Sequence, residues 1–105
     1  PVKIAIINNG YLGMVRQWQE KLFNKHYSQT PITSPDYVKL AEAYGVLGMR
    51  ITKESEIDEA LEKAMAYNGP VIMDFIVEPF EMVYPWILPG KPLNEVLLSN
   101  SEMGE

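Results

Sequence analysis

The sequence contains no cysteine and only one histidine, His26. Without cysteine the chain has no disulfide framework and no thiolate to serve as a nucleophile or metal ligand, which fits a reducing compartment. Basic residues are also few, with 9 Lys and Arg against 14 Asp and Glu and a net charge of −5. Because contacts to nucleic-acid phosphates need clustered Lys and Arg, this balance argues against nucleic acid as a partner.

Long hydrophobic runs are absent as well. The longest apolar segments have the length of a strand, far below the ~20 residues of a membrane-spanning helix, so we expect no membrane association. The length of 105 residues allows one domain at most. A free domain of this size buries roughly 65% of the surface that its unfolded chain exposes, which is enough for a modest core.

Two apolar, β-branched runs stand out in what the sequence does contain. They cover residues 2–7 and 71–77, and the second is interrupted only by Asp74. Continuous runs of this kind are typical of strands covered on both faces of a parallel sheet. A shorter segment at 47–51 alternates apolar and other residues and is predicted as a third strand.

Three segments with helical spacing separate these strands, each with apolar residues every three or four positions. Ser34 is predicted to cap the second helix, because Pro35 and an acid follow it. Thr52 or Ser55 is predicted to cap the third. The apolar faces comprise Val15, Trp18 and Leu22 in the first helix; Tyr37, Leu40, Ala41 and Tyr44 in the second; and Ile57, Ala60, Leu61, Ala64 and Met65 in the third.

This alternation of strands and helices predicts an α/β fold, with helices on both faces of a three-layer parallel sheet. We expect strand 71–77 to lie between the other two, because the two longest apolar runs should form the most buried pair. Residues 80–92 are rich in proline but too apolar for a solvated linker. They are predicted to form an extended tail packed on another surface, followed by a last turn at 93–98.

A polar segment follows the first strand directly and contains Asn8, Asn9, Gly10 and Gly13. In open parallel sheets, ligands bind at the carboxyl ends of strands. Carboxamide oxygens suit a hard cation, and a helix start near glycines suits an anion. The alternative is a plain turn, because Asn followed by Gly readily adopts positive φ. The residues alone leave both interpretations open.

Four other residues have structural interpretations. A lone histidine in a loop, His26, is most simply solvated. Trp18 and Met14 share one side of the first helix, where core packing is the usual role. Asp74 is an acid within an apolar strand, so it needs a partner when buried, and we interpret it as structural, bonded to a loop or a neighbouring domain.

Residues 6–19, Ile-Ile-Asn-Asn-Gly-Tyr-Leu-Gly-Met-Val-Arg-Gln-Trp-Gln, closely resemble thiamine-diphosphate enzymes, most of all the large catalytic subunit of acetolactate synthase. Residues 35–45, Gly69-Pro70-Val71 and Tyr84-Pro85 resemble the same family. The resemblance extends to about residue 98. It implies that residues 1–98 are the C-terminal portion of a thiamine-diphosphate-binding domain within a longer subunit, and we expect a disordered tail at 99–105.

The resemblance also implies the site residues. Asn9 would give its side-chain oxygen, and Tyr11 its backbone carbonyl, to the Mg²⁺ that holds the diphosphate. Trp18 would line the substrate channel. No catalytic residue is expected here, because the Gly-Asp-Gly half of the motif and the cofactor-activating glutamate are not in this sequence. The implied cofactor-binding residues are Asn9, Gly10, Tyr11, Leu12, Gly13 and Met14.

The implied parent enzyme is a transferase that decarboxylates pyruvate and condenses it with a second 2-oxo acid in branched-chain amino-acid biosynthesis. FAD would belong to that parent and not to this chain, which should be inactive alone. Implied partners are the remainder of the subunit, further copies in a homo-oligomer and a regulatory small subunit, in the cytoplasm or a eukaryotic organelle. Alternatives are a pyruvate oxidase or carboligase, against which Trp18 argues, and a free-standing, non-catalytic α/β interaction module.

Overall fold

The computed structural model describes residues 1–99. The chain divides into two compact units, each made of two separate segments. The first unit comprises Pro1–Tyr11 and Pro31–Pro79. The second comprises Leu12–Thr30 and the chain from Phe80 onward. The predicted disordered tail at 99–105 lies outside the described residues, apart from Ser99.

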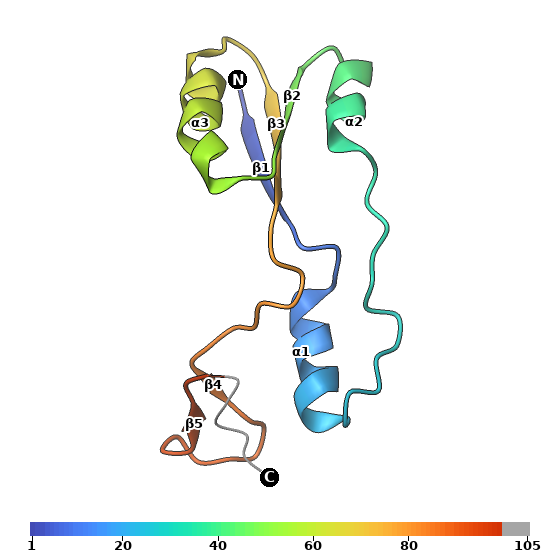
Figure 1. Cartoon of the computed structure of the whole chain (residues 1–105), viewed down its shortest axis with the longest axis vertical. Coiled ribbons are helices and arrows are strands. Elements are labelled where there is room, and N and C mark those ends of the chain that lie inside the picture. The colour runs from blue at the N-terminus through green and yellow to red at the C-terminus, as the bar shows by residue number, and fades with distance from the viewer. Residues whose placement is uncertain (100–105) are drawn as a thin grey trace. The chain divides into compact units, whose positions relative to one another are not determined.

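The first unit is a parallel three-stranded sheet with a helix on each face (Figure 1). Its strands are β1 (Lys3–Asn8), β2 (Leu47–Ile51) and β3 (Val71–Ile76), in the order β1-β3-β2. The helices α2 (Tyr37–Ala43) and α3 (Ile57–Ala66) flank it. The α/β fold class and the central position of the last strand are therefore confirmed.

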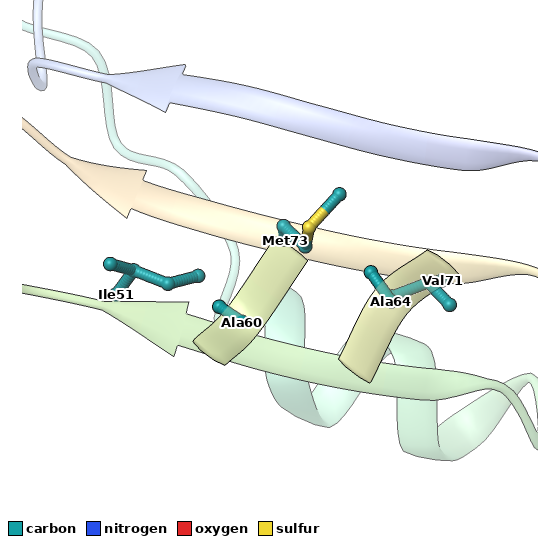
Figure 2. Packing of buried hydrophobic residues seen from close by; sticks show 5 residues of the cluster. All are labelled: Ile51, Ala60, Ala64, Val71 and Met73. Atoms are coloured by element: carbon teal, nitrogen blue, oxygen red, sulfur yellow. The ribbon is translucent and has the colours of Figure 1, made fainter. Parts of the chain in front are cut away.

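The core of the first unit lies between α3 and the sheet (Figure 2). Ala60 and Ala64 of α3 are buried, and their small side chains let the helix approach the strands closely. Alternate residues of β2 and β3 face them, because side chains along a strand point to opposite faces in turn. The strand residues of this cluster are Ile51, Val71 and Met73, with Leu47, Met49 and Phe75 packed around them.

The opposite face of the sheet is covered by α2, and Gly48 permits that contact. A Cβ at Gly48 would lie 2.7 Å from the Cβ of Ala41 and 3.0 Å from the Cα of Val38. Ala41 is completely buried. The backbones of α2 and β2 therefore meet at a position where only glycine fits.

Both predicted caps of the first unit's helices are wrong. Asp36 caps α2 in place of Ser34, because its carboxylate accepts from the amides of Val38 at 3.1 Å and Lys39 at 3.2 Å. A short 3₁₀ turn, Glu54–Glu56, precedes α3, and neither Thr52 nor Ser55 provides a capping side-chain bond. Instead the Glu56 carboxylate accepts from the amide of Thr52 at 3.0 Å and of Lys53 at 3.2 Å. In each case one carboxylate accepts from two backbone amides at or just before the start of the helix.

The expectation that strand 2–7 is covered on both faces is also wrong. Ile4 is 42% exposed and Ile7 is 68% exposed. α2 packs on β2 and β3 and α3 packs on β2, whereas β1 pairs only with β3. β1 is thus an apolar edge strand that both helix layers leave largely uncovered.

The second unit combines the helix α1 (Gly13–Leu22) with a small antiparallel sheet of β4 (Trp86–Ile87) and β5 (Val96–Leu97). The chain turns at residues 93–94 within the predicted last turn, and Val96 and Leu97 of the same segment form β5. The extended segment packs on α1: the buried Gln17 side chain accepts from the Val83 amide at 2.8 Å and donates to its carbonyl at 3.1 Å. Over residues 1–99, no helix has the length and apolarity to cross a membrane.

Candidate functional site

The segment after β1, Asn8–Tyr11, forms a tight turn shaped by both carboxamides. The Asn8 Oδ1 accepts from the Gly10 amide at 3.2 Å, and the Asn9 Oδ1 accepts from the Tyr11 amide at 3.1 Å. Gly10 has φ +73°, in the region that favours glycine. The turn geometry is therefore present, and it is compatible with ligand binding, because an amide oxygen has two lone pairs.

The Asn8–Tyr11 turn sits at the carboxyl end of the sheet, where ligands bind in open parallel sheets. The Val77 amide donates to the Asn8 carbonyl at 3.1 Å, which extends the β1–β3 ladder to the start of the turn. On the other side, the Ile32 amide donates to the Gly10 carbonyl at 2.9 Å. The turn is thus held from two directions within the first unit.

The backbone of Tyr11 has a fixed direction, because Tyr11 forms an isolated antiparallel bridge with Pro31. The hydrogen bonds of that bridge come from neighbouring residues, so the peptide groups of Tyr11 itself point away from Pro31. The Tyr11 amide bonds the Asn9 side-chain oxygen on that side. In an extended residue the carbonyl points to the same side as the amide. The two predicted metal ligands, the Asn9 side-chain oxygen and the Tyr11 carbonyl, thus share one side of the turn.

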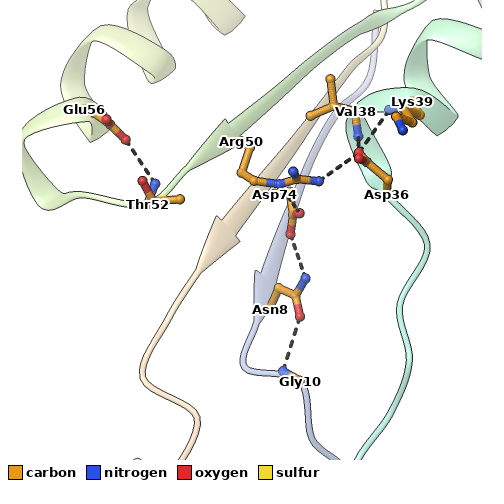
Figure 3. A network of polar contacts seen from close by, with 9 residues as sticks. All are labelled: Asn8, Gly10, Asp36, Val38, Lys39, Arg50, Thr52, Glu56 and Asp74. Atoms are coloured by element: carbon orange, nitrogen blue, oxygen red, sulfur yellow. Dashed lines mark hydrogen bonds and ion pairs between the residues drawn. The ribbon is translucent and has the colours of Figure 1, made fainter.

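Next to the turn lies a network of polar and charged side chains, in which Asn8, Asp74, Arg50 and Asp36 contact one another in series (Figure 3). Asp74 is 2% exposed, and its Oδ1 accepts from the Asn8 Nδ2 at 3.0 Å. Its Oδ2 forms an ion pair with the Arg50 Nε at 3.4 Å, and the same guanidinium contacts Asp36 at 2.8 Å. Asp74 thus has the partners that a buried acid needs, but they are Asn8 at the end of β1 and Arg50 of β2, in place of the expected loop or neighbouring domain.

The charged forms of Asp36 and Arg50 are stabilised by their contacts in this network. The Lys39 amide, which donates to Asp36, holds the pKa of that carboxyl below its ordinary value, and the positive charge of Arg50 acts in the same direction. The bond to Asp74 raises the pKa of the Arg50 guanidinium, and the nearby charge of Asp36 adds to the effect. Arg50 thus stays charged between two carboxylates.

Sequence reasoning missed Arg50, although a signal existed. Arg50 interrupts one apolar strand and Asp74 interrupts another. The β2–β3 register places these two residues directly beside each other. Two opposite charges in adjacent apolar strands therefore indicate an ion pair across those strands once the strand order is known.

The other predicted residues lie on α1, in the second unit. Leu12 occupies the N-cap position without a capping bond, Gly13 begins the helix, and its first turn contains no acid. Met14 is 44% exposed and Trp18 is 38% exposed. Both line an open, mostly apolar groove of about 720 Å³ whose other lining residues are Val15, Gln19, Leu22, Phe23, Asn24 and His26.

Among the described residues, no acidic or histidine-rich metal cluster supplements the turn. Over residues 1–99, no group of three or more His, Cys, Asp and Glu residues is placed to hold a metal ion. The turn itself offers neutral oxygens from Asn9 and Tyr11. A cation bound there would need its negative ligands from outside the described part of the chain, which fits a magnesium ion that takes most of its ligands from phosphates and water.

Residues 1–75 match the family described as "Thiamine pyrophosphate enzyme, C-terminal TPP binding domain". The chain belongs to the thiamine pyrophosphate enzymes. The match includes the Asn8–Tyr11 turn, α1 and the whole sheet, except the last residue of β3. It supports thiamine diphosphate (thiamine pyrophosphate) as the cofactor, whereas the roles of individual residues in this family member remain predictions.

Similar proteins include several acetolactate synthases. The chain is 44% identical to "Acetolactate synthase" of Mycobacterium bovis, over 91% of this chain and 16% of that protein. It is 40% identical to "Acetolactate synthase, mitochondrial" of Schizosaccharomyces pombe, over 96% and 15%. It is 38% identical to "Acetolactate synthase isozyme 2 large subunit" of Escherichia coli, over 92% and 18%. This thiamine pyrophosphate enzyme sequence thus spans about a sixth of the length of the curated relatives that it matches.

Proposed function

We propose that the chain is the C-terminal part of the cofactor-binding domain of an acetolactate synthase. The parent enzyme decarboxylates pyruvate and joins the product to a second 2-oxo acid, in branched-chain amino-acid biosynthesis. The observation that carries this proposal is the Asn8–Tyr11 turn at the carboxyl end of the sheet, with two oxygen donors on one side. The acetolactate synthases among the similar proteins support the choice of reaction.

The turn fits a magnesium ion bound to a diphosphate. The Asn9 side-chain oxygen and the Tyr11 carbonyl would be ligands, and both are hard, neutral oxygens of the kind Mg²⁺ accepts alongside phosphate and water. Thiamine diphosphate supplies the carbanion chemistry when bound, as cofactors of this class do. The residues of this chain bind and orient: Gly10 allows the tight turn that presents the oxygens of Asn9 and Tyr11.

Catalytic groups, in this proposal, come from outside the chain. None of the described residues near the turn is proposed as a general acid or base, so the chain alone would be inactive. Its partners would be the remainder of the catalytic subunit, which would also hold FAD, a further copy of that subunit and a regulatory small subunit. The enzyme would act in the cytoplasm, or in an organelle of a eukaryote.

A chimera tests the proposal. The matching segment of the Escherichia coli isozyme 2 large subunit is replaced by this chain, and acetolactate formation from pyruvate is measured with Mg²⁺ and thiamine diphosphate. We expect activity in the chimera and none with the chain alone. Asn9→Ala in the chimera should raise the Mg²⁺ requirement at least tenfold, because a metal ligand is lost. Asn68→Ala is the matched control, since Asn68 also precedes a glycine but is exposed in a different loop.

Three results would count against the proposal. One is pyruvate turnover by the isolated chain. Another is a folded chimera that binds cofactor but forms no acetolactate. The third is an equal change in the Mg²⁺ requirement in Asn9→Ala and Asn68→Ala, which would show that the turn does not bind the metal.

A further inference from the structure

Asp74 is a charged residue in the middle of the central strand of the first unit. Its neighbours along β3, Met73 and Phe75, belong to the apolar core, and its own side chain is 2% exposed. A buried carboxylate is unfavourable unless it is paired and hydrogen-bonded. Asp74 has both kinds of partner, the Arg50 guanidinium at 3.4 Å and the Asn8 amide at 3.0 Å.

Asn8 connects this carboxylate to the Asn8–Tyr11 turn. Its Nδ2 donates to Asp74, and its Oδ1 accepts from the Gly10 amide at 3.2 Å. An ionised carboxylate can only accept, so the NH₂ group of Asn8 must face Asp74. The oxygen of Asn8 is thereby directed at the Gly10 amide. The charge on Asp74 thus selects one of the two orientations that the Asn8 amide could adopt.

The selected orientation fixes the peptide that follows Asn9. With the Gly10 amide held by Asn8, the plane of the Asn9–Gly10 peptide is set, and Gly10 keeps φ at +73°. The next amide, that of Tyr11, then meets the Asn9 Oδ1 at 3.1 Å. The oxygens of Asn9 and Tyr11 are therefore positioned by contacts that begin at Asp74.

We propose that Asp74 is a positioning residue for the cofactor-bound metal ion, acting through Asn8 on the turn that carries Asn9. Arg50 supports this role by neutralising the buried charge, and Asp36 holds Arg50 from its other side at 2.8 Å. This role rests on the proposed function, because it presumes that Asn9 and Tyr11 bind the metal.

Exchanging the donor and the acceptor of the Asn8–Asp74 hydrogen bond tests whether Asp74 acts on the turn through Asn8, in the full chain. In Asn8→Asp, two acidic side chains face each other, so the contact with Asp74 is lost. The double variant Asn8→Asp with Asp74→Asn restores it with donor and acceptor exchanged, and the carboxylate at position 8 still accepts from Gly10. We expect hydrogen exchange of the Gly10 amide, followed by NMR, to rise at least tenfold in the single variant. The double variant should return to within about twofold of the unmodified chain.

Glu42→Gln is the matched control, because Glu42 is an exposed acid of α2 and takes no part in the contacts that join Asn8, Asp74, Arg50 and Asp36. Gly10 exchange should stay unchanged in it. If the single variant does not fold, the double variant decides: a folded double variant with normal Gly10 exchange supports the connection. A folded double variant in which Gly10 exchange stays fast overturns it.

A second readout follows the metal site directly. Mn²⁺ with thiamine diphosphate, at millimolar concentrations, serves as a paramagnetic probe that broadens nearby NMR signals. We expect the signals of Asn9 and Tyr11 to broaden in the unmodified chain. The Asn8→Asp variant should need at least tenfold more Mn²⁺ for the same broadening, and the double variant should need about as much as the unmodified chain. Equal broadening in all three chains would overturn the role of Asp74 while leaving the proposed function intact. No broadening at Asn9 and Tyr11 in the unmodified chain would overturn both.

Discussion

At the scale of single residues, Asp36 combines a helix cap with an ion pair, and its pKa is lowered in the folded chain, first by the Lys39 amide and also by Arg50. A lowered pKa stabilises the fold fully above the ordinary value of 3.8, and this stabilisation is lost as the pH falls through the folded value. Asp36→Asn keeps a capping oxygen but removes the charge. We therefore expect a smaller loss of stability on acidification in this variant.

Urea unfolding of the full chain, repeated from neutral pH to below the ordinary pKa of an aspartate, measures this effect. Glu42→Gln is the control, because Glu42 is an exposed acid of the same helix. An acid sensitivity in Asp36→Asn equal to that of the unmodified chain would contradict the prediction.

Gln17 gives a second prediction at this scale. It is 1% exposed and makes two hydrogen bonds with the backbone of Val83. In Gln17→Ala both backbone groups lose their partner, so we expect the second unit to lose about 1–3 kcal/mol of stability. Gln19→Ala removes a comparable pair of bonds, to Ser28, that are exposed to solvent and should change stability by less than about 0.5 kcal/mol. Urea unfolding of the full chain measures both, and similar free energies of unfolding for the two variants would refute the difference.

At the scale of elements, the contact between α2 and β2 depends on Gly48. A methyl group there would lie 2.7 Å from the Ala41 Cβ and 3.0 Å from the Val38 Cα, so the helix would have to move. We expect Gly48→Ala to destabilise the chain by about 1–3 kcal/mol, as overpacking does. Gly69→Ala is the control, because its nearest neighbour is the partly exposed ring of Tyr67, which can move aside. Thermal unfolding compares the two, and equal melting temperatures would disprove the constraint.

The central position of β3 could be predicted because its long apolar run matches its burial, whereas the similar run of β1 belongs to an exposed edge strand. The caps could not, since Ser34 and Asp36 are both capping residues and only the path of the chain decides between them. The exposure of β1 was missed because an apolar pattern does not tell what covers it. β4 and β5 have two residues each, too few for any periodicity.

The candidate site was predictable in part for a related reason. Two carboxamides after a strand indicate a site at its carboxyl end, and the structure places them there. The contacts of Asn8 with Asp74, and of Asp74 with Arg50, join segments 24 to 66 positions apart in sequence. Such contacts follow from strand register, which the local sequence does not contain.

At the scale of the whole molecule, the edge of β1 predicts self-association. Ile7 is 68% exposed on an edge strand whose outer backbone groups have no strand partner among residues 1–99. Such an edge is a template for pairing with another chain. We expect the isolated chain to form dimers or larger species in sedimentation equilibrium, and Ile7→Lys to shift it to a 12.0 kDa monomer. Met65→Lys, at a 73% exposed position on α3, should leave association unchanged; a monomeric unmodified chain would contradict the prediction.

The bridge between Tyr11 and Pro31 joins the two segments of the first unit at the point where residues 12–30 leave it. Residues 12–30 are therefore an insertion in the sequence of the first unit. Opposed residues in such a bridge lie about 4.5 Å apart, a distance that a two-residue hairpin turn spans. Within the first unit, the Ile32 amide donates to the Gly10 carbonyl at 2.9 Å, so a hydrogen bond joins the residues on either side of the insertion. Lengthening, shortening or exchanging the inserted segment therefore leaves the framework of the sheet unbroken. Such changes fall instead on the second unit, in which Gln17 of this segment bonds the backbone of Val83.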